Sequence, residues 1–183
     1  TEHELEGFAF RTLPEPGALL ATFATVNDVH FGEVECGIID GSDIGPTFRA
    51  PEGGPPYPEL MNRAAVAEIA ALDPAAVVVK GDLTSNGTQA EFEAFLACYA
   101  PFGDRLVAVA GNHESYHHAT FARDPWQAIT LPGAILAVLD TSVDARTAGD
   151  LTADQLDWLD ALAADADRTV LVFAHHPLGD PDS

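Results

Sequence analysis

The sequence predicts a layered α/β domain in which helices cover a sheet. Five short apolar runs, each bounded by turn residues, are expected to be buried strands, and amphipathic segments lie between most of them. A chain of 183 residues, 47% of them hydrophobic, can bury one sizeable core. The order of these segments determines where functional residues can lie.

The first half of the chain is expected to begin with a strand, a loop, a helix and a second strand. Residues 19–26 and 75–79 are the apolar runs of the two strands. Between them, residues 31–57 are rich in Gly, Pro and Asp and predict a long loop. A helix is predicted over residues 58–72, where Asp73-Pro74 ends it. Its apolar residues at helical spacing are Leu60, Ala64, Ala67, Ile69 and Leu72.

Capping residues mark two further helices. Thr88 begins one as a capping box with Glu91, and Thr152 is the expected N-cap of the other. The expected buried faces are Phe92, Phe95, Leu96 and Tyr99 in the first helix and Leu156, Trp158, Leu159 and Leu162 in the second. The remaining strands are expected at residues 105–110, 135–139 and 169–174.

The charge is strongly negative, with 29 acidic and 8 basic residues and a formal net charge of −21. Because DNA and RNA are bound mainly through cationic contacts to phosphate, a long nucleic acid is not an expected partner. A small phosphate ester would also be repelled unless bound cations supplied positive charge. No apolar run approaches the roughly 18 residues that span a bilayer, so no membrane span is expected. Cys36 and Cys98 are expected to be free thiols, and localisation stays open.

Five segments follow the apolar runs, and each carries a possible metal ligand. They are Asn27-Asp28-Val29-His30, Gly81-Asp82, Gly111-Asn112-His113-Glu114, Asp140-Thr141 and His175-His176-Pro177. In open α/β sheets the loops at the carboxyl ends of the strands meet at one crevice. We therefore expect these segments to converge.

The first two segments carry carboxylates and an imidazole. Asp28 and His30 are one residue apart, so on an extended segment both side chains point the same way. A carboxylate beside an imidazole suits Zn, Mn, Fe or Co better than Ca. Gly81 permits a sharp turn that presents Asp82 at the strand tip, and a carboxylate there can bridge two cations about 3.5 to 4 Å apart.

The later segments add an amide and several histidines. Asn112 offers an amide oxygen, and His113 can protonate or hydrogen-bond a leaving oxygen because imidazole titrates near neutral pH. Glu114 could hold the His113 imidazole. His175 ends a buried strand, where its ring nitrogens need partners, and a metal is one candidate. We expect a supporting role for His176 and solvent exposure for His117 and His118.

Residues 19–177 resemble the calcineurin-like metallophosphoesterase superfamily. The resemblance rests on four motifs that occur in the order of that family's pattern: Asp28-Val29-His30, Gly81-Asp82, Gly111-Asn112-His113 and His175. Within the superfamily, Leu139-Asp140-Thr141-Ser142 followed by Gly149, Leu151, Gln155-Leu156 and Trp158-Leu159 is similar to the cyclic-nucleotide phosphodiesterase branch. The resemblance implies a sheet sandwich with flanking helices.

The resemblance also implies a site with two metal ions, drawn from Mn, Fe, Zn or Co. Asp28 and His30 would hold one ion, Asn112 and His175 the other, and Asp82 would bridge them. A metal-held water or hydroxide would attack phosphorus in line with the leaving oxygen, with His113 as the acid or transition-state stabiliser.

Departures from the family pattern narrow the substrate. Ser85 replaces the tyrosine of purple acid phosphatases, which disfavours a ferric-tyrosinate centre, and residues 81–87 lack the arginine of protein serine/threonine phosphatases. A small phosphodiester is therefore favoured, either a cyclic nucleotide or a glycerophosphodiester. A phosphomonoesterase or nucleotidase, and a noncatalytic binding or scaffolding module of the same fold, stay open as alternatives.

The sequence at both ends of the chain predicts that it is a fragment of a longer protein. Residues 1–13 alternate like a lone strand, and Phe10-Arg11-Thr12 resembles the closing strand of a fibronectin-like domain, so we expect them to complete an upstream β-sandwich-like domain. Residues 14–183 are expected to be a metallophosphoesterase catalytic domain that is incomplete at its C-terminus. The family's final Gly-His-x-His, which supplies one ligand to each metal, does not occur in this sequence, so weak metal binding and inactivity of the fragment are expected.

Overall fold

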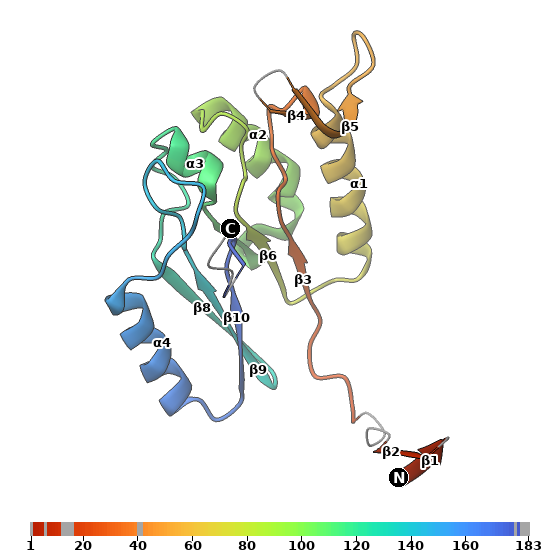
Figure 1. Ribbon diagram of the computed structural model, residues 1–183, viewed down its shortest axis with the longest axis vertical. Helices are drawn as coiled ribbons and strands as arrows, with labels where there is room; N and C mark the ends of the chain where they lie inside the picture. Colours follow the sequence, from red (N-terminus) through yellow and green to blue (C-terminus); the bar gives the residue numbers. More distant parts are fainter. Residues whose placement is uncertain (1, 6, 12–16, 40–41, 178, 180–183) are drawn as a thin grey trace.

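A parallel three-stranded sheet carries the first group of predicted ligands. The computed structural model describes residues 2–5, 7–11, 17–39, 42–177 and 179. The strands of this sheet, in spatial order, are β3 (Phe23–Val26), β6 (Ala76–Lys80) and β7 (Leu106–Val109) (Figure 1). All three were predicted. The first is shorter than expected, because Leu19 and Leu20 precede the strand and are exposed.

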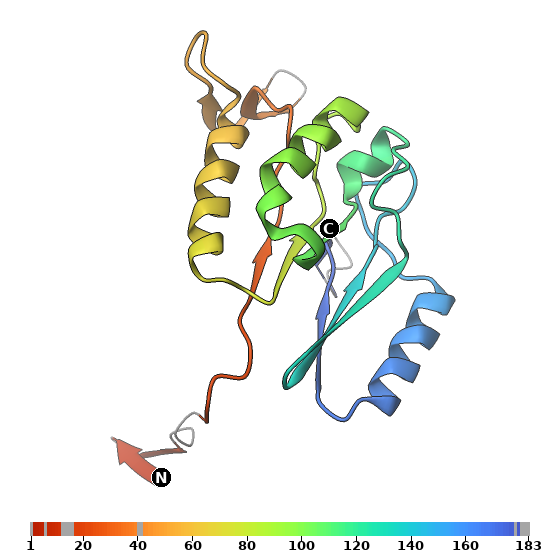
Figure 2. The ribbon, with the colours of Figure 1, turned by 180° about the vertical axis from the view of Figure 1, so that it is seen from behind.

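Two helices cover one face of this sheet, α1 (Tyr57–Ala71) and α2 (Gln89–Tyr99), and a 3₁₀ turn, η1 (Ala100–Arg105), follows α2 (Figure 2). The central strand is buried on both faces, as in parallel sheets with elements on each side. Successive side chains of a strand point to opposite faces, so Val77 and Val79 pack toward the helices while Ala76 and Val78 pack toward the second sheet.

The second sheet is mixed. Its strands, in spatial order, are β10 (Thr169–Phe173), β9 (Ala134–Leu139) and β8 (Trp126–Leu131). β10 is parallel to β9, and β8 is antiparallel to it. Phe23 of the first sheet meets Phe173 of the second edge to face, with ring centroids 5.8 Å apart. The two sheets thus enclose an apolar layer, which confirms the predicted layered α/β fold.

β8 was not predicted. Two of its six side chains, Ala128 and Thr130, are exposed and only Leu131 is buried, so the apolar signal is weak. A turn at Gly133 (φ +81°) joins it to β9. The pairing runs from Trp126 opposite Leu139 to Leu131 opposite Ala134.

The expected buried face of α4 (Ala153–Asp165) was partly wrong. Trp158 stacks on Trp126 of β8, but Leu156 is 47% exposed. The buried residue is Gln155, whose Nε2 donates to the carbonyl oxygens of Pro125 (2.8 Å) and Asp140 (2.6 Å). An amide that satisfies two backbone acceptors can occupy a buried position that hydrophobic periodicity assigns to leucine.

The expected buried face of α1 was also largely wrong, because of its five expected residues only Ile69 is half-buried and packs against the core. Leu60, Ala64, Ala67 and Leu72 are exposed, and the buried residues are Pro58, Asn62 and Val66. These three are spaced four residues apart, which places them on one side of a helix. A polar residue lies at the centre of that side.

The predicted long loop at residues 31–57 contains an antiparallel hairpin. Its strands are β4 (Glu35–Ile39) and β5 (Ser42–Arg49), with a register irregularity between Cys36 and Ile38. The Gly and Pro content of this segment hid the strands, because such residues are depleted in strands and weaken the periodic signal.

The first residues also pair with each other. β1 (Glu2–Leu5) and β2 (Phe8–Arg11) form an antiparallel hairpin, so the expectation of a lone strand was wrong. The hairpin is set apart from the two sheets (Figure 1). Its assignment to an upstream domain stays a prediction, and the boundary between residues 13 and 14 lies outside the described residues, as does residue 183, where the incomplete C-terminus was predicted. Among the helices described here, none has the length and apolar character needed to cross a bilayer.

The capping box predicted at Thr88 and the N-cap predicted at Thr152 are both formed, and Thr152 makes a capping box with Gln155 as well. Glu91 Oε2 accepts the Thr88 N–H at 3.2 Å and the Asn86 N–H at 3.0 Å, and Oε1 accepts from the Asn86 amide at 2.8 Å. Burial works to raise the pKa of Glu91, but these hydrogen bonds outweigh it and hold the pKa below its usual value of 4.5.

We expect Glu91→Ala to lower the free energy of unfolding by about 1 kcal/mol at pH 7, the usual cost of losing a helix cap. Because the folded-state pKa is depressed, this stabilisation is present above pH 4.5 and is lost as pH falls through the folded-state value. Urea unfolding at pH 7 and pH 3 measures it. Glu93→Ala is the control, since exposed Glu93 accepts only from Gln89 among the hydrogen bonds recorded for the described chain. Equal losses in the two variants, or a loss independent of pH, would contradict the assignment.

Candidate metal centre

The loops that leave β3 and β6 remain paired beyond the sheet. The Asp28 N–H donates to the Gly81 carbonyl at 3.3 Å, and the His30 N–H donates to the Asp82 carbonyl at 2.9 Å. These bonds continue the parallel register of the strands, in which Val26 lies opposite Val79. The first two predicted ligand segments are therefore adjacent because their strands are.

Three of the predicted ligands have strained backbones. The φ angles are +55° at Asp28, +45° at His30 and +49° at Asp82. A residue with a Cβ rarely adopts this left-handed backbone conformation, and each such residue destabilises the folded state by on the order of 1–3 kcal/mol. Such strain persists only where the surrounding structure fixes the backbone, and it clusters at functional sites.

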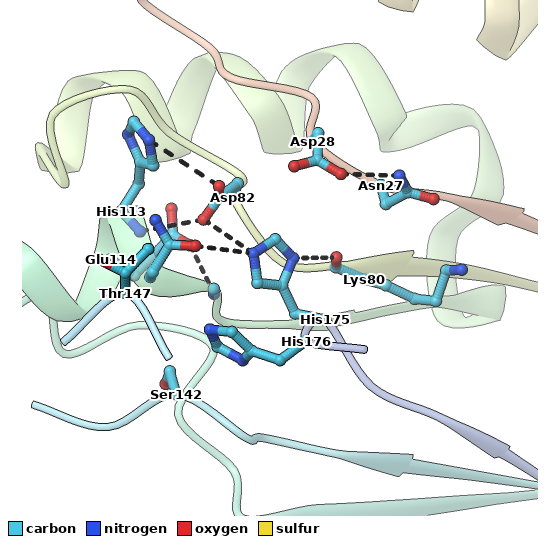
Figure 3. Close-up of polar contacts among 12 residues, drawn as sticks. Asn27, Asp28, Lys80, Asp82, His113, Glu114, Ser142, Thr147, His175 and His176 are labelled. Carbon is cyan, nitrogen blue, oxygen red and sulfur yellow. Dashed lines mark hydrogen bonds and ion pairs between the residues drawn. The ribbon is translucent and has the colours of Figure 1, made fainter. Parts of the chain in front are cut away.

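The carboxylate of Asp82 lies at the centre of the site (Figure 3). The residue is 3% exposed. Its Oδ2 lies 3.6 Å from His30 Nε2 and 3.9 Å from His113 Nε2, and its Oδ1 lies 3.5 Å from His175 Nε2. The His113 backbone N–H also donates to Oδ1 at 3.0 Å. Three imidazoles from three different segments of the chain thus face one buried carboxylate.

Two groups of ligand atoms share Asp82. One is His30, Asp82 and His113, and the other is Asp28, Asp82 and His175. Within each group the ligand atoms lie within 4.8 Å of one another. The predicted convergence of the β3, β6, β7 and β10 exits is therefore present in the fold.

The fourth predicted ligand, Asn112, begins the short helix α3 (Asn112–Tyr116) and contacts His175. His175 Nδ1 donates to the Lys80 carbonyl at 2.9 Å, which leaves the lone pair of the neutral ring on Nε2. That lone pair faces Asn112 Oδ1 at 3.0 Å and Asp82 Oδ1 at 3.5 Å, so three acceptor atoms converge. A cation satisfies such a set, and mixed nitrogen and oxygen ligands suit the metals named above.

The local charges favour ionised ligands. Contact with His30 is the main cause that lowers the pKa of Asp28 to about 2, and it outweighs the opposing effect of burial. Burial works to lower the pKa of His30, but contact with Asp28 and the charges of Asp82 and Glu33 raise it overall. A bound metal ion must displace the proton that this environment favours on His30, so metal affinity falls as pH falls.

Two glycines leave room for the ligands. A Cβ at Gly81, where φ is +76°, would lie 2.4 Å from His175 Cγ. A Cβ at Gly111 would lie 2.3 Å from Asp82 Oδ1. The predicted need for a glycine before Asp82 is confirmed, and close approach of the histidine ring adds a second reason for it.

Glu114 has a different role from the one expected. It does not hold the His113 imidazole, whose Nδ1 donates to the Ser85 carbonyl at 2.8 Å. Instead, the fully buried Glu114 carboxylate accepts from the Gly111 N–H at 2.8 Å and from the Thr84 N–H and hydroxyl at 2.8 and 2.6 Å. Glu114 therefore ties the exit of β7 to the exit of β6. This contact could not be predicted from local sequence, because Thr84 and Glu114 are thirty residues apart.

The fourth predicted segment, Asp140-Thr141, belongs to neither of the two groups of possible metal ligands in the described residues. Asp140 accepts from Arg123 Nε at 2.9 Å and from the backbone and hydroxyl of Ser142. Its neighbour Thr141 contacts His176 Nδ1 at 2.8 Å, which agrees with a supporting role for His176.

Two further histidines, His117 and His118, also lie outside both groups of possible metal ligands in the described part of the chain. His117 and His118 are exposed, as expected, and His118 pairs with Asp144 at 2.8 Å. A cavity of about 1080 Å³ adjoins the site and is lined in part by Asp28, Asn112 and His175. Its other walls include Leu151 and Leu156, so it combines ligand residues with apolar surface.

Residues 21–183 match the family model described as calcineurin-like phosphoesterase. The chain belongs to this family. The resemblance seen in its motifs is thereby confirmed, and the family implies that divalent metal ions are bound.

Several curated relatives of this calcineurin-like phosphoesterase are named phosphodiesterases. A probable cyclic nucleotide phosphodiesterase of Synechococcus sp. is 30% identical over 57% of this chain and 43% of its own length. A cAMP/cGMP dual specificity phosphodiesterase of Mycobacterium tuberculosis is 33% identical over 58% of this chain and 37% of its own length. The 3',5'-cyclic adenosine monophosphate phosphodiesterase CpdA of Escherichia coli is 29% identical over 56% of this chain and 40% of its own length. The matches therefore span less than half the length of these relatives.

A solved structure shares the calcineurin-like phosphoesterase fold. A dimetal phosphatase from Danio rerio superposes with a TM-score of 0.64 over 87% of this chain and 71% of that chain, at 15% identity. Sequence identity at this level supports the fold alone, and the predicted sheet sandwich with flanking helices is confirmed.

We expect Gly111→Ala to weaken Mn²⁺ binding by roughly 10- to 100-fold, the usual effect of disturbing groups that orient metal ligands. The added methyl group would meet Asp82 and displace the central carboxylate. Calorimetric Mn²⁺ titration of the natural polypeptide measures the effect. Gly45→Ala is the matched control, because a Cβ there has no neighbour within 4 Å among the residues placed. Unchanged affinity in Gly111→Ala would argue against Asp82 as a ligand.

Proposed function

We propose that this chain forms the catalytic part of a metal-dependent phosphoesterase that uses two metal ions to hydrolyse a small phosphodiester. The observation that carries the proposal is the sharing of one buried carboxylate, Asp82, by two groups of ligand atoms. A two-metal site needs a ligand that reaches both ions, and a carboxylate has two oxygens with which to do so. The phosphodiesterase relatives support the same class of reaction.

The ligand assignment is the one that the family resemblance implies. Asp28 and His30, from the β3 exit, would hold one ion, Asn112 and His175, from the β7 and β10 exits, would hold the other, and Asp82 would contribute to both. In the structure Asp28 also lies within reach of His175, and His30 within reach of His113. The neutral amide of Asn112 keeps the ligand charge low, which favours an anionic substrate. When bound, the ions lower the pKa of a water nucleophile and neutralise charge on the phosphoryl oxygens.

His113 is assigned to the leaving group. Its Nδ1 donates to the Ser85 carbonyl, so the ring is oriented and Nε2 is the atom available for proton transfer. The side chain is 31% exposed, so a substrate can reach it. As water adds to phosphorus and the bond to the leaving oxygen breaks, a proton on Nε2 passes to that oxygen. The same Nε2 also lies within the group formed by His30 and Asp82, so metal content must be measured to separate the two roles.

A small diester with an organic group fits the surroundings best. The adjoining cavity, about 1080 Å³, is large enough for a nucleoside- or glycerol-sized group beside the phosphate. Cyclic nucleotide and glycerophosphodiester substrates are both consistent with the names of the relatives, which include a probable glycerophosphodiester phosphodiesterase of Arcobacter nitrofigilis.

Hydrolysis of bis(p-nitrophenyl) phosphate by the natural polypeptide, with and without Mn²⁺, tests the proposal. Turnover that requires Mn²⁺ and stops on chelation is the expected result. Faster turnover of p-nitrophenyl phosphate would favour the monoesterase or nucleotidase alternative. Binding of two ions without hydrolysis of either compound would favour the noncatalytic module.

We expect Asp82→Asn to abolish Mn²⁺-dependent turnover, because both ions lose a charged ligand. Asp140→Asn is the matched control, since Asp140 is also a buried aspartate at a strand exit but pairs with Arg123. Turnover and Mn²⁺ content are measured for both variants. Retention of two tightly bound ions in Asp82→Asn would refute the shared carboxylate.

We expect His113→Ala to lower turnover by roughly 10² to 10⁴, the scale for one general acid, while metal content stays unchanged. The effect should be smaller for a diester whose leaving group is p-nitrophenolate, which needs little protonation. His118→Ala is the control, because His118 is exposed and bonded to Asp144. Loss of a metal ion from His113→Ala would make this histidine a ligand instead.

A further inference from the structure

Asn62 is a polar residue in an apolar core. It lies on the buried side of α1, is 6% exposed, and is next to the hydrophobic cluster that contains Val29 and Tyr99. An amide in such surroundings is costly unless its hydrogen bonds are made. Here they are made. Nδ2 donates to the carbonyls of Val29 (2.9 Å) and Pro58 (2.8 Å), and Oδ1 accepts from the Tyr99 hydroxyl (2.8 Å).

The bond to Val29 reaches the most strained part of the metal centre. Val29 lies between Asp28 and His30, both of which have left-handed backbones. The N–H groups of Asp28 and His30 are held by the β6 exit, as described above. The Val29 carbonyl is held by Asn62. The loop is therefore fixed from two directions, by the neighbouring loop and by α1.

Tyr99 fixes the orientation of the Asn62 amide. Its hydroxyl is fully buried at the end of α2, and burial raises the pKa of Tyr99, so the group stays protonated and donates. Because Oδ1 of Asn62 accepts this proton, the NH₂ group is directed toward Val29. Two helices thus determine where one backbone carbonyl of the metal-binding loop lies.

We propose that Asn62, oriented by Tyr99, is a positioning residue that holds the Asp28–His30 loop in its metal-binding conformation. The inference rests on the proposed function, since it assigns a metal ion to Asp28 and His30. Among the hydrogen bonds of the described residues, those of Asn62 reach no ligand side chain, so Asn62 acts on the ligands through the Val29 backbone. It also explains why the buried side of α1 contains an asparagine where an apolar residue would pack as well.

Asn62→Leu tests the inference, because leucine has a similar volume and makes none of the three hydrogen bonds. Gln155→Leu is the matched control: Gln155 is also a buried amide that donates to two carbonyls, but these belong to Pro125 and Asp140, which are neither assigned ligands nor part of the Asp28–His30 loop. Mn²⁺ dissociation constants and thermal unfolding midpoints of the natural polypeptide are measured for both variants.

We expect both variants to unfold at lower temperature, but only Asn62→Leu to raise the dissociation constant of one of the two ions, by roughly 10- to 100-fold. Tyr99→Phe should raise the same constant by a smaller factor, because the amide keeps its donors but loses its orientation. Equal metal affinity in Asn62→Leu and Gln155→Leu would overturn the inference and leave Asn62 a residue of the core. If Asn62→Leu does not fold, unchanged affinity in Tyr99→Phe overturns it.

The wild-type measurement separates this inference from the proposed function. A wild-type protein that binds no Mn²⁺ pair, or binds it without hydrolysing either ester, counts against the function. A wild-type protein that binds and hydrolyses, with Asn62→Leu unaffected, counts against the role of Asn62 alone.

Discussion

The parallel pairing of β3 with β6 is the constraint on which the metal centre depends. The pairing continues past the last residues of both strands, and the same backbone bonds that extend it hold Asp28 and His30 beside Asp82. The left-handed backbones of these three residues are unfavourable by themselves. Burial of Val29 and the neighbouring strands offsets that strain, so the stability of the core maintains the geometry of the site.

The sequence predicted the parts of the fold whose signal is local. The central strand β6 is a continuous apolar run because it is covered on both faces. The helix starts follow from the capping residues Thr88 and Thr152, with Glu91 three positions after the first. The buried sides of α1 and α4 could not be predicted in the same way. Asn62 and Gln155 are buried because distant groups satisfy their amides, and hydrophobic periodicity carries no information about such partners.

The same distinction applies to the site. Asp82 and Asp140 both follow buried strands, and only the preceding Gly81 and the family resemblance favoured Asp82 as the metal ligand. Only the fold places Asp82 among three histidines and Asp140 beside Arg123. Glu114 was recognised as part of the motif, but its bonds to Thr84 depend on the proximity of two strand exits. The acidic character of the whole chain, with a net charge of −21, makes this cluster of ligands the place where positive charge from metal ions is needed to attract an anionic ester.

The central claim is that one carboxylate joins two metal ions. Electron paramagnetic resonance of the natural polypeptide loaded with two equivalents of Mn²⁺ tests it directly, because ions that share a bridging ligand are magnetically coupled. The account predicts an exchange-coupled dinuclear spectrum, and that spectrum should be replaced by an uncoupled one when Asp82 is changed to Asn. Uncoupled Mn²⁺ signals from the wild-type protein would contradict it.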